Sequence, residues 1–193
     1  MKRISRLNDF TRISKLVKIA FFHCMFYLTD YFVLKSSNKS GSNSIVLIRL
    51  DMLGDFTIWV TSARYYRKLY PGKKIILICN AAWSNLAKEF DYWDVIIPIN
   101  VDYFSRKISY RLKVLREIRK ISCEIVIQPT ISRSFLTGDS VVRLINADKK
   151  IGSEGDLNNS AFIFNFIANR WYSLLIKNNV ADITEIKKNI RFL

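Results

Sequence analysis

The chain has 193 residues, of which 50% are hydrophobic, so it can bury one good core and is not disordered. Its formal charge of +15 indicates an anionic partner: nucleic acid, an acidic membrane surface or a phosphorylated substrate. A single histidine nearly excludes a Ser-His-Asp triad and a multi-histidine metal site, and the three widely spaced cysteines fit buried thiols of a reducing compartment better than a disulfide set or a zinc site.

Residues 1–35 are predicted to form a basic and aromatic amphipathic helical segment. Lys and Arg side chains alternate with apolar ones over residues 2–18, and aromatic residues are frequent from there to residue 34. Such a segment can lie in the headgroup region of an anionic membrane, pack on the domain, or span the bilayer, which needs about 20 apolar residues. Residues 36–44, rich in Ser, Asn and Gly, are typical of a linker to a domain at residues 45–193.

A strand, a turn and a helix are predicted at the start of that domain. Residues 45–50 form an apolar run interrupted only by Arg49, which is typical of a buried strand. Asp55 is predicted to be the N-cap of a helix over residues 56–69. Ligands of open α/β sheets bind at the carboxyl ends of the strands, so the turn from Asp51 to Asp55 is the first candidate site.

Strands and helices are predicted to alternate through most of the remaining chain. Apolar runs predict strands at residues 74–80, 95–99, 124–128 and 150–152, and helical spacing predicts helices at residues 82–90, 107–121 and 134–145. Residues 162–167 fit a strand or a helix, whereas residues 171–176 and 183–192 fit helices. Continuous apolar strands predict an α/β fold, a Rossmann-like parallel sheet with helices on both faces.

The stretch from residue 45 to residue 71 resembles the opening of the family 9 glycosyltransferases, which include the lipopolysaccharide heptosyltransferases. The family pattern is an apolar strand, then R-x-D-x-x-G-D, then a helix ending in R-x-x-Y-P. The matching residues are Arg49, Asp51, Gly54, Asp55, Ala63, Arg67, Tyr70 and Pro71. Further matches are Gln128 and Arg133, Lys150-Ile151-Gly152, residues 155–159, and Glu185, Asn189 and Phe192. The resemblance implies the N-terminal, acceptor-binding domain of a GT-B glycosyltransferase.

The resemblance implies that Asp55 is the base of an inverting sugar transfer. A carboxylate within hydrogen-bonding reach of the acceptor hydroxyl is sufficient for this role. The same side chain would stabilise the helix as a cap, and the two roles are compatible. The residues implied to bind the acceptor are Arg49, Asp51, Gly54, Gln128 and Arg133.

Most of these acceptor-binding candidates also have a structural interpretation. Asp51 can orient Asp55 or bond to the backbone of its own turn. Arg49 can reach the pocket or pair with Asp51. Gln128 can bind the acceptor or the edge of its strand. Arg133 can clamp a phosphate or carboxylate bidentately, or it can be solvated.

The resemblance further implies a glycolipid or saccharide acceptor and a nucleotide-sugar donor such as ADP-heptose, with no other cofactor and no metal. In the family the donor binds to a second Rossmann-like domain, which we expect to be absent here, leaving this chain inactive alone. We expect a cytoplasmic protein, peripheral to the inner face of the cytoplasmic membrane. No nucleic-acid-binding motif accompanies the charge, so we expect no nucleic acid partner. The alternative functions are a non-catalytic membrane-attached scaffold and a basic nucleic-acid-binding module.

Overall fold

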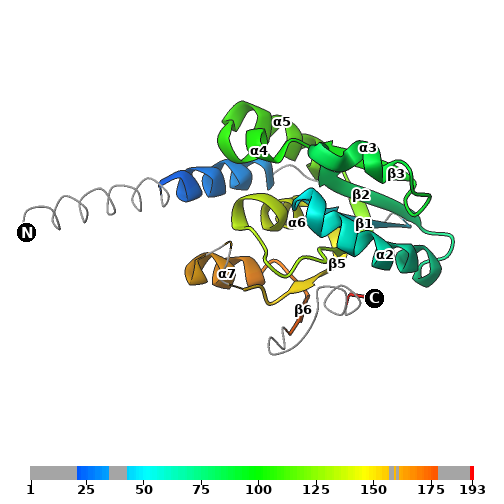
Figure 1. The fold of residues 1–193 in the computed structure, drawn as a ribbon. Helices are drawn as coiled ribbons and strands as arrows, with labels where there is room; N and C mark the ends of the chain where they lie inside the picture. Colours follow the sequence, from blue (N-terminus) through cyan, green and yellow to red (C-terminus); the bar gives the residue numbers. More distant parts are fainter. Residues whose placement is uncertain (1–20, 35–42, 157–158, 160, 178–191) are drawn as a thin grey trace, which may run out of the picture.

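The computed structural model describes residues 21–34, 43–156, 159, 161–177 and 192–193. Six strands form one parallel sheet in the order β3-β2-β1-β4-β5-β6, with helices on both faces (Figure 1). This architecture confirms the predicted Rossmann-like α/β class. The basic stretch at residues 2–18, most of the predicted linker and the predicted helix at residues 183–192 lie outside the described residues, apart from Phe192.

The elements alternate along the chain as the apolar runs predicted. The strands are β1 (Ser44–Arg49), β2 (Lys74–Asn80), β3 (Val95–Ile99), β4 (Ser122–Ile127), β5 (Asn146–Ser153) and β6 (Leu174–Ile176). The α-helices that follow β1 are α2 (Leu53–Leu69), α3 (Ser84–Ala87), α4 (Val101–Arg106), α5 (Ile108–Arg119), α6 (Ser140–Leu144) and α7 (Phe162–Asn169). A helix over residues 21–34, called the N-terminal helix below, precedes β1.

The buried side chains of β1 divide between two cores. Ile45 and Leu47 belong to the core between the sheet and α2, whereas Val46 and Ile48 belong to the core under α5 and α6. Burial on both faces explains why the strand is a continuous apolar run. Because β1 pairs with both β2 and β4, the strand order reverses beside it, and open α/β sheets bind ligands at such a switch point.

Several predicted boundaries differ from the structure, and one prediction is wrong. Residues 171–176 were predicted to be helical, but β6 in this range pairs with β5 as an edge strand. Three residues are too few to show a strand or helix period, which accounts for the error. The predicted helix at residues 134–145 begins with a π-helical turn, Phe135–Asp139, and residues 162–167 belong to a helix, α7.

The N-terminal helix packs on the domain through one face. Phe26 and Val33 are buried, and Asp30 is paired with the buried Arg111 of α5. Arg111 donates to the two carboxylate oxygens of Asp30 at 2.8 and 2.6 Å. Of the three placements predicted for this segment, packing on the domain is therefore observed for the described part. Among the described helices, none has the length and apolarity needed to cross a membrane.

Candidate active site

The turn between β1 and α2 is tied to the end of β4 through a buried arginine. Arg49 donates from one Nη atom to the carbonyl of Pro129 and from the other to the carbonyl of Asp55 at 3.3 Å. Its Nε lies 2.7 Å from Oδ2 of Asp51. Arg49 therefore pairs with Asp51, and it also lines the cleft described below, so both of its predicted alternatives are observed.

The same turn is tied to the end of β2 on its other side. The carbonyl of Asp51 accepts hydrogen bonds from Nδ2 of Asn80 at 3.2 Å and from the indole Nε1 of Trp83 at 3.0 Å. Trp83 in turn stacks on Phe56 of α2, with ring centroids 4.2 Å apart. The start of α2 is thus held between the ends of β2 and β4, the two strands that flank β1.

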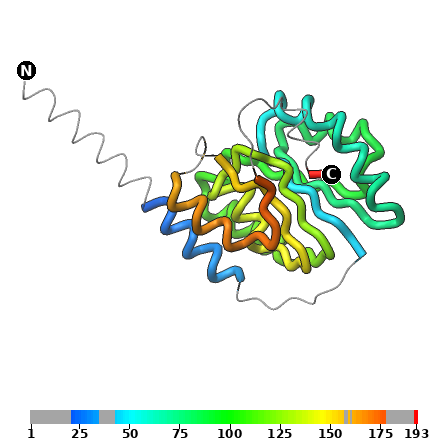
Figure 2. Tube along the Cα trace, turned by 90° about the horizontal axis from the view of Figure 1, so that it is seen from below, coloured from blue at the N-terminus to red at the C-terminus, as the bar shows by residue number. Residues whose placement is uncertain are grey.

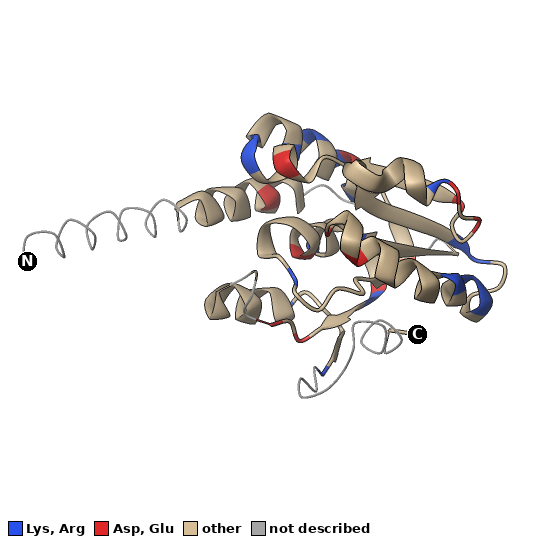
Figure 3. Cartoon of the chain, viewed as in Figure 1, with Lys and Arg blue, Asp and Glu red and all other residues tan. Residues whose placement is uncertain are grey.

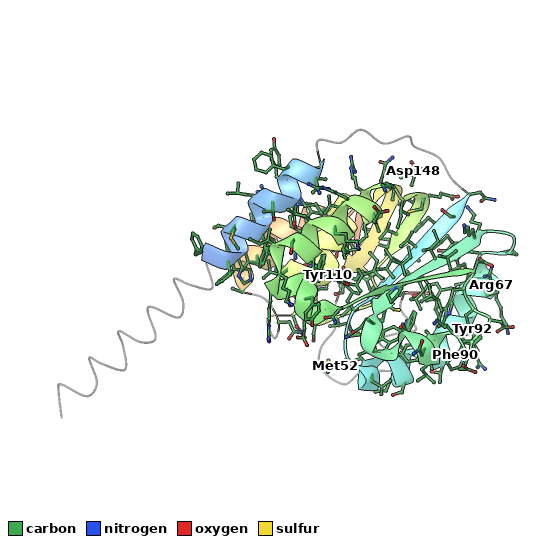
Figure 4. The ribbon with its side chains drawn as sticks, turned by 90° about the horizontal axis from the view of Figure 1, so that it is seen from above. Met52, Arg67, Phe90, Tyr92, Tyr110 and Asp148 are labelled. Carbon is green, nitrogen blue, oxygen red and sulfur yellow. The ribbon has the colours of Figure 1, made fainter. Side chains whose placement is uncertain are left out.

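Asp55 lies in the first turn of α2 and is not its N-cap, which corrects the sequence prediction. The helix begins two residues after Asp51, with Met52 as the N-cap. Oδ2 of Asp55 accepts a hydrogen bond from the backbone N–H of Met52 at 3.3 Å. The helix dipole favours an anion at this position. Met52 and Arg67 mark the two ends of α2 in Figure 4, and Asp55 itself is exposed.

The loop after β4 forms the facing wall. Ser153 donates to the carbonyl of Thr130 at 3.0 Å, and Ser132 donates to Oδ2 of Asp156 at 2.7 Å. Nδ2 of Asn159 donates to the carbonyl of Ser132 at 2.9 Å. These bonds fix the loop to the segment that follows β5.

A polar cleft of about 110 Å³ lies between the two walls, at the switch point of the sheet. Its lining residues are Arg49, Asp51, Asp55, Thr130, Ile131, Ser132 and Asn159. The larger hollows of about 250, 410 and 530 Å³ have mostly apolar linings and share no residue with it. Within the described parts of the chain, no group of three or more His, Cys, Asp or Glu residues is placed to hold a metal ion.

The two carboxylates of the cleft differ in their surroundings. Burial raises the pKa of Asp51 to about 6, although Arg49 beside it lowers the pKa; the nearby Asp55 raises it further. Asp51 therefore takes up and releases a proton in a pH range where a carboxylate is ordinarily charged.

Replacement of Asp51 by Asn is expected to change how stability varies with pH. The folded-state pKa of about 6 exceeds the ordinary 3.8, so between these values the folded protein holds a proton that the unfolded chain has released. The contribution of this proton to the stability of the fold is complete below about pH 4 and is lost as the pH rises through about 6. The free energy of unfolding of the wild type minus that of Asp51→Asn should therefore fall by about 1–3 kcal/mol over this range. Urea titrations at several pH values measure this difference in the free energy of unfolding. A difference that stays flat or rises with pH contradicts a raised pKa of Asp51.

Gln128 and Arg133 do not line the cleft. Both are buried, and Oε1 of Gln128 contacts the hydroxyl of Tyr172. Arg133 binds Oδ1 of Asn169 and has its guanidinium over the ring of Tyr172, 4.6 Å from the centroid. Arg133 is 0% exposed, so its predicted solvated alternative is wrong, and both side chains contact other residues of the fold.

Of the six predicted site residues, the structure brings together the ones that are close in sequence. Arg49, Asp51 and Asp55 line the cleft, and Gly54 lies in the same turn. Three polar lining residues were not predicted: Thr130, Ser132 and Asn159. They lie in the loops that follow β4 and β5, and this was the available signal, because the ends of these paired strands meet at one edge of the parallel sheet.

The fold and the cleft together define a Rossmann-like α/β domain with a candidate ligand site at its switch point. No family model and no curated protein matches the sequence. Solved structures do match. E. coli heptosyltransferase WaaC with ADP-2-deoxy-2-fluoro heptose has a TM-score of 0.58 and 16% identity over 77% of this chain and 46% of that chain. The family 9 glycosyl transferase from Veillonella parvula DSM 2008 has a TM-score of 0.61 and 16% identity over 81% of this chain and 42% of that chain.

These similarities confirm the predicted resemblance to family 9 glycosyltransferases at the level of the fold. WaaC with ADP gives a third match, with a TM-score of 0.57 and 18% identity. The chain spans less than half the length of the structures it matches, since 42% to 46% of those chains is covered.

Proposed function

We propose that this chain is the acceptor-side domain of an inverting glycosyltransferase and that Asp55 is its general base. The observation that carries the proposal is an exposed carboxylate in the first turn of α2, inside a polar cleft at the switch point of the sheet. The turn that holds it is tied to β2 and β4, so the carboxylate is pre-positioned for a ligand.

In the proposed reaction the acceptor hydroxyl enters the cleft and gives its proton to the carboxylate of Asp55. The hydroxyl oxygen forms a bond to the anomeric carbon of the donor on the face opposite the diphosphate. The bond between that carbon and the diphosphate breaks, and the nucleotide diphosphate leaves with the electron pair. Arg49 acts as a positioning residue, because its guanidinium holds the turn that carries Asp55.

The lining of the cleft suits a polyhydroxylated acceptor such as the saccharide of a glycolipid. It offers the hydroxyls of Thr130 and Ser132, the amide of Asn159 and two carboxylates, and sugars are bound through hydrogen bonds to such groups. Complete ligand pockets measure about 300–1,000 Å³, so a cleft of about 110 Å³ fits one wall of a larger site. We infer that a nucleotide-sugar such as ADP-heptose occupies the other wall, on a second domain, and that this chain alone is inactive.

The proposal is tested by combining this chain with the nucleotide-sugar-binding half of a heptosyltransferase and assaying transfer from ADP-heptose to a panel of cell-surface saccharides. Saccharide binding to the chain alone is followed by NMR. We expect the amide signals of the cleft residues to shift first. The proposal is contradicted if no saccharide accepts the sugar and none shifts the NMR signals of the cleft residues.

Replacement of Gly54 by Ala is expected to stabilise the fold and weaken the reaction. An added Cβ would meet nothing within 4 Å, so the fold itself leaves room for it. Alanine in a helix is more stable than glycine by about 0.5–1 kcal/mol. The added methyl group lies one residue before Asp55, and we expect it to displace the bound acceptor and lower kcat/KM by about tenfold. Urea unfolding and transfer assays measure the two effects.

Gly72→Ala is the matched control for this substitution. An added Cβ at Gly72 also meets nothing within 4 Å, but its φ of +74° disfavours alanine. We expect this variant to lose about 1 kcal/mol of stability and to keep its activity. Equal activity of Gly54→Ala and the wild type would remove Gly54 from the acceptor site.

A further inference from the structure

The N-terminal helix exposes several large apolar side chains and buries its charged residue. Phe21, Leu28 and Phe32 are 65%, 55% and 70% exposed. Asp30, its only charged residue among the described ones, is 1% exposed and paired with Arg111. A helix that faces water normally exposes its charged residues and buries its apolar stripe, whereas this helix buries Asp30 beside Phe26 and Val33 and exposes a second set of apolar side chains.

The neighbouring helix α7 likewise exposes large apolar side chains. Phe162, Ile163 and Phe166 are exposed, whereas the polar Asn165 is buried and donates to the carbonyl of Asp156 at 2.7 Å. The two helices lie side by side in Figure 2. The rings of His23 and Phe164 join them, stacked with centroids 4.3 Å apart.

These exposed side chains belong to two helices that contact each other, and we call them together the apolar ridge. Its residues are Phe21, Phe22, Leu28, Tyr31 and Phe32 of the N-terminal helix and Phe162, Ile163 and Phe166 of α7. Figure 3 shows no Lys or Arg on either helix, and Asp30 is the single acidic residue within residues 21–34 and 162–169. Exposed apolar surfaces of this kind mark sites that bind a protein, a membrane or a ligand.

Cationic side chains border the apolar ridge. Arg116, Arg119 and Lys120 of α5 and its C-terminus line a hollow of about 530 Å³ together with Phe32. At the other helix, the guanidinium of Arg170 lies 4.8 Å from the ring centroid of Phe166. In the sequence, the N-terminal helix follows the stretch of residues 2–18, which contains Lys and Arg but only one acid.

We propose that the apolar ridge is a membrane-docking surface that lies in the headgroup region of a bilayer containing anionic lipids. Aromatic and leucine side chains enter the boundary between headgroups and acyl chains, while the exposed Arg116 and Arg170 meet lipid phosphates. A second copy of this chain fits the surface less well, because it would bring two proteins of charge +15 together. This inference is independent of the proposed function.

The test is co-sedimentation of the full chain with phosphatidylcholine vesicles, with and without phosphatidylglycerol. We expect binding that requires phosphatidylglycerol and weakens with salt. The double variant Phe32→Ser/Phe162→Ser should bind these vesicles about tenfold more weakly or less, because each phenylalanine leaves the bilayer interface. The control Leu69→Ser alters an exposed apolar residue of α2, on the other face of the sheet, and should bind like the wild type.

Equal binding of the double variant and the wild type overturns the proposal, as does equal binding to the two kinds of vesicle. A dimer in solution that the double variant abolishes would assign the apolar ridge to a second copy and would also overturn it. Both substitutions are at exposed positions, and thermal unfolding verifies that the variant is folded. Asp55→Asn should bind vesicles normally, so failure of the proposed function leaves this result unaffected.

Discussion

Replacement of Asp55 by Asn is expected to lower kcat for sugar transfer by about 10²- to 10⁴-fold, the usual contribution of a general base. Asparagine has the same shape and can still accept the hydrogen bond from the N–H of Met52, so the start of α2 should be retained. What it lacks is the capacity to take the acceptor proton. The measurement is transfer by this chain combined with a nucleotide-sugar-binding half, with thermal unfolding of the variant beside it.

Asp102→Asn is the matched control. Asp102 is an exposed acid in the first turn of α4, which follows β3 on the same sheet, and it does not line the cleft. We expect this variant to transfer sugar at the wild-type rate. If Asp55→Asn transfers sugar within about twofold of Asp102→Asn, Asp55 is not the base, and its role is the stabilisation of α2.

The sequence predicts those site residues that lie close together in one strand-turn-helix segment. Arg49, Asp51 and Asp55 follow from a strand, a turn and a helix within a few residues, and all three line the cleft. Gln128 and Arg133 also follow a strand end, but long-range contacts decide whether such side chains point outward. Their partners Tyr172 and Asn169 come from a distant part of the chain, and no local spacing reveals them.

The fold was predictable for a similar reason. Strands buried on both faces are apolar throughout, and β1, β2, β3 and β4 appear near their predicted positions. Periodicity also identified the N-terminal helix, but it could not show which face is buried. That outcome depends on Asp30 meeting Arg111, which lies 81 residues further along the chain.

Loss of the ion pair between Asp30 and Arg111 is expected to destabilise this protein strongly. Arg111 is 0% exposed and lies between the rings of Phe26 and Phe104, 4.9 and 4.5 Å from their centroids. In Asp30→Ala the guanidinium stays buried without its carboxylate, which costs about 3–5 kcal/mol. Urea unfolding measures this loss, and the N-terminal helix should become susceptible to proteolysis, since Asp30 helps to hold it on α5.

A double variant distinguishes the cost of an unpaired charge from the loss of a favourable contact. Asp30→Leu/Arg111→Met removes both charges, so we expect it to be more stable than Asp30→Ala although it changes two residues. Glu117→Ala breaks the exposed ion pair between Glu117 and Lys120, which lies further along the same helix as Arg111. This change should alter stability by less than about 1 kcal/mol. If Asp30→Ala is no more destabilised than Glu117→Ala, the buried pair does not hold the N-terminal helix in place. The apolar ridge would then lose the anchor that fixes its orientation on the domain.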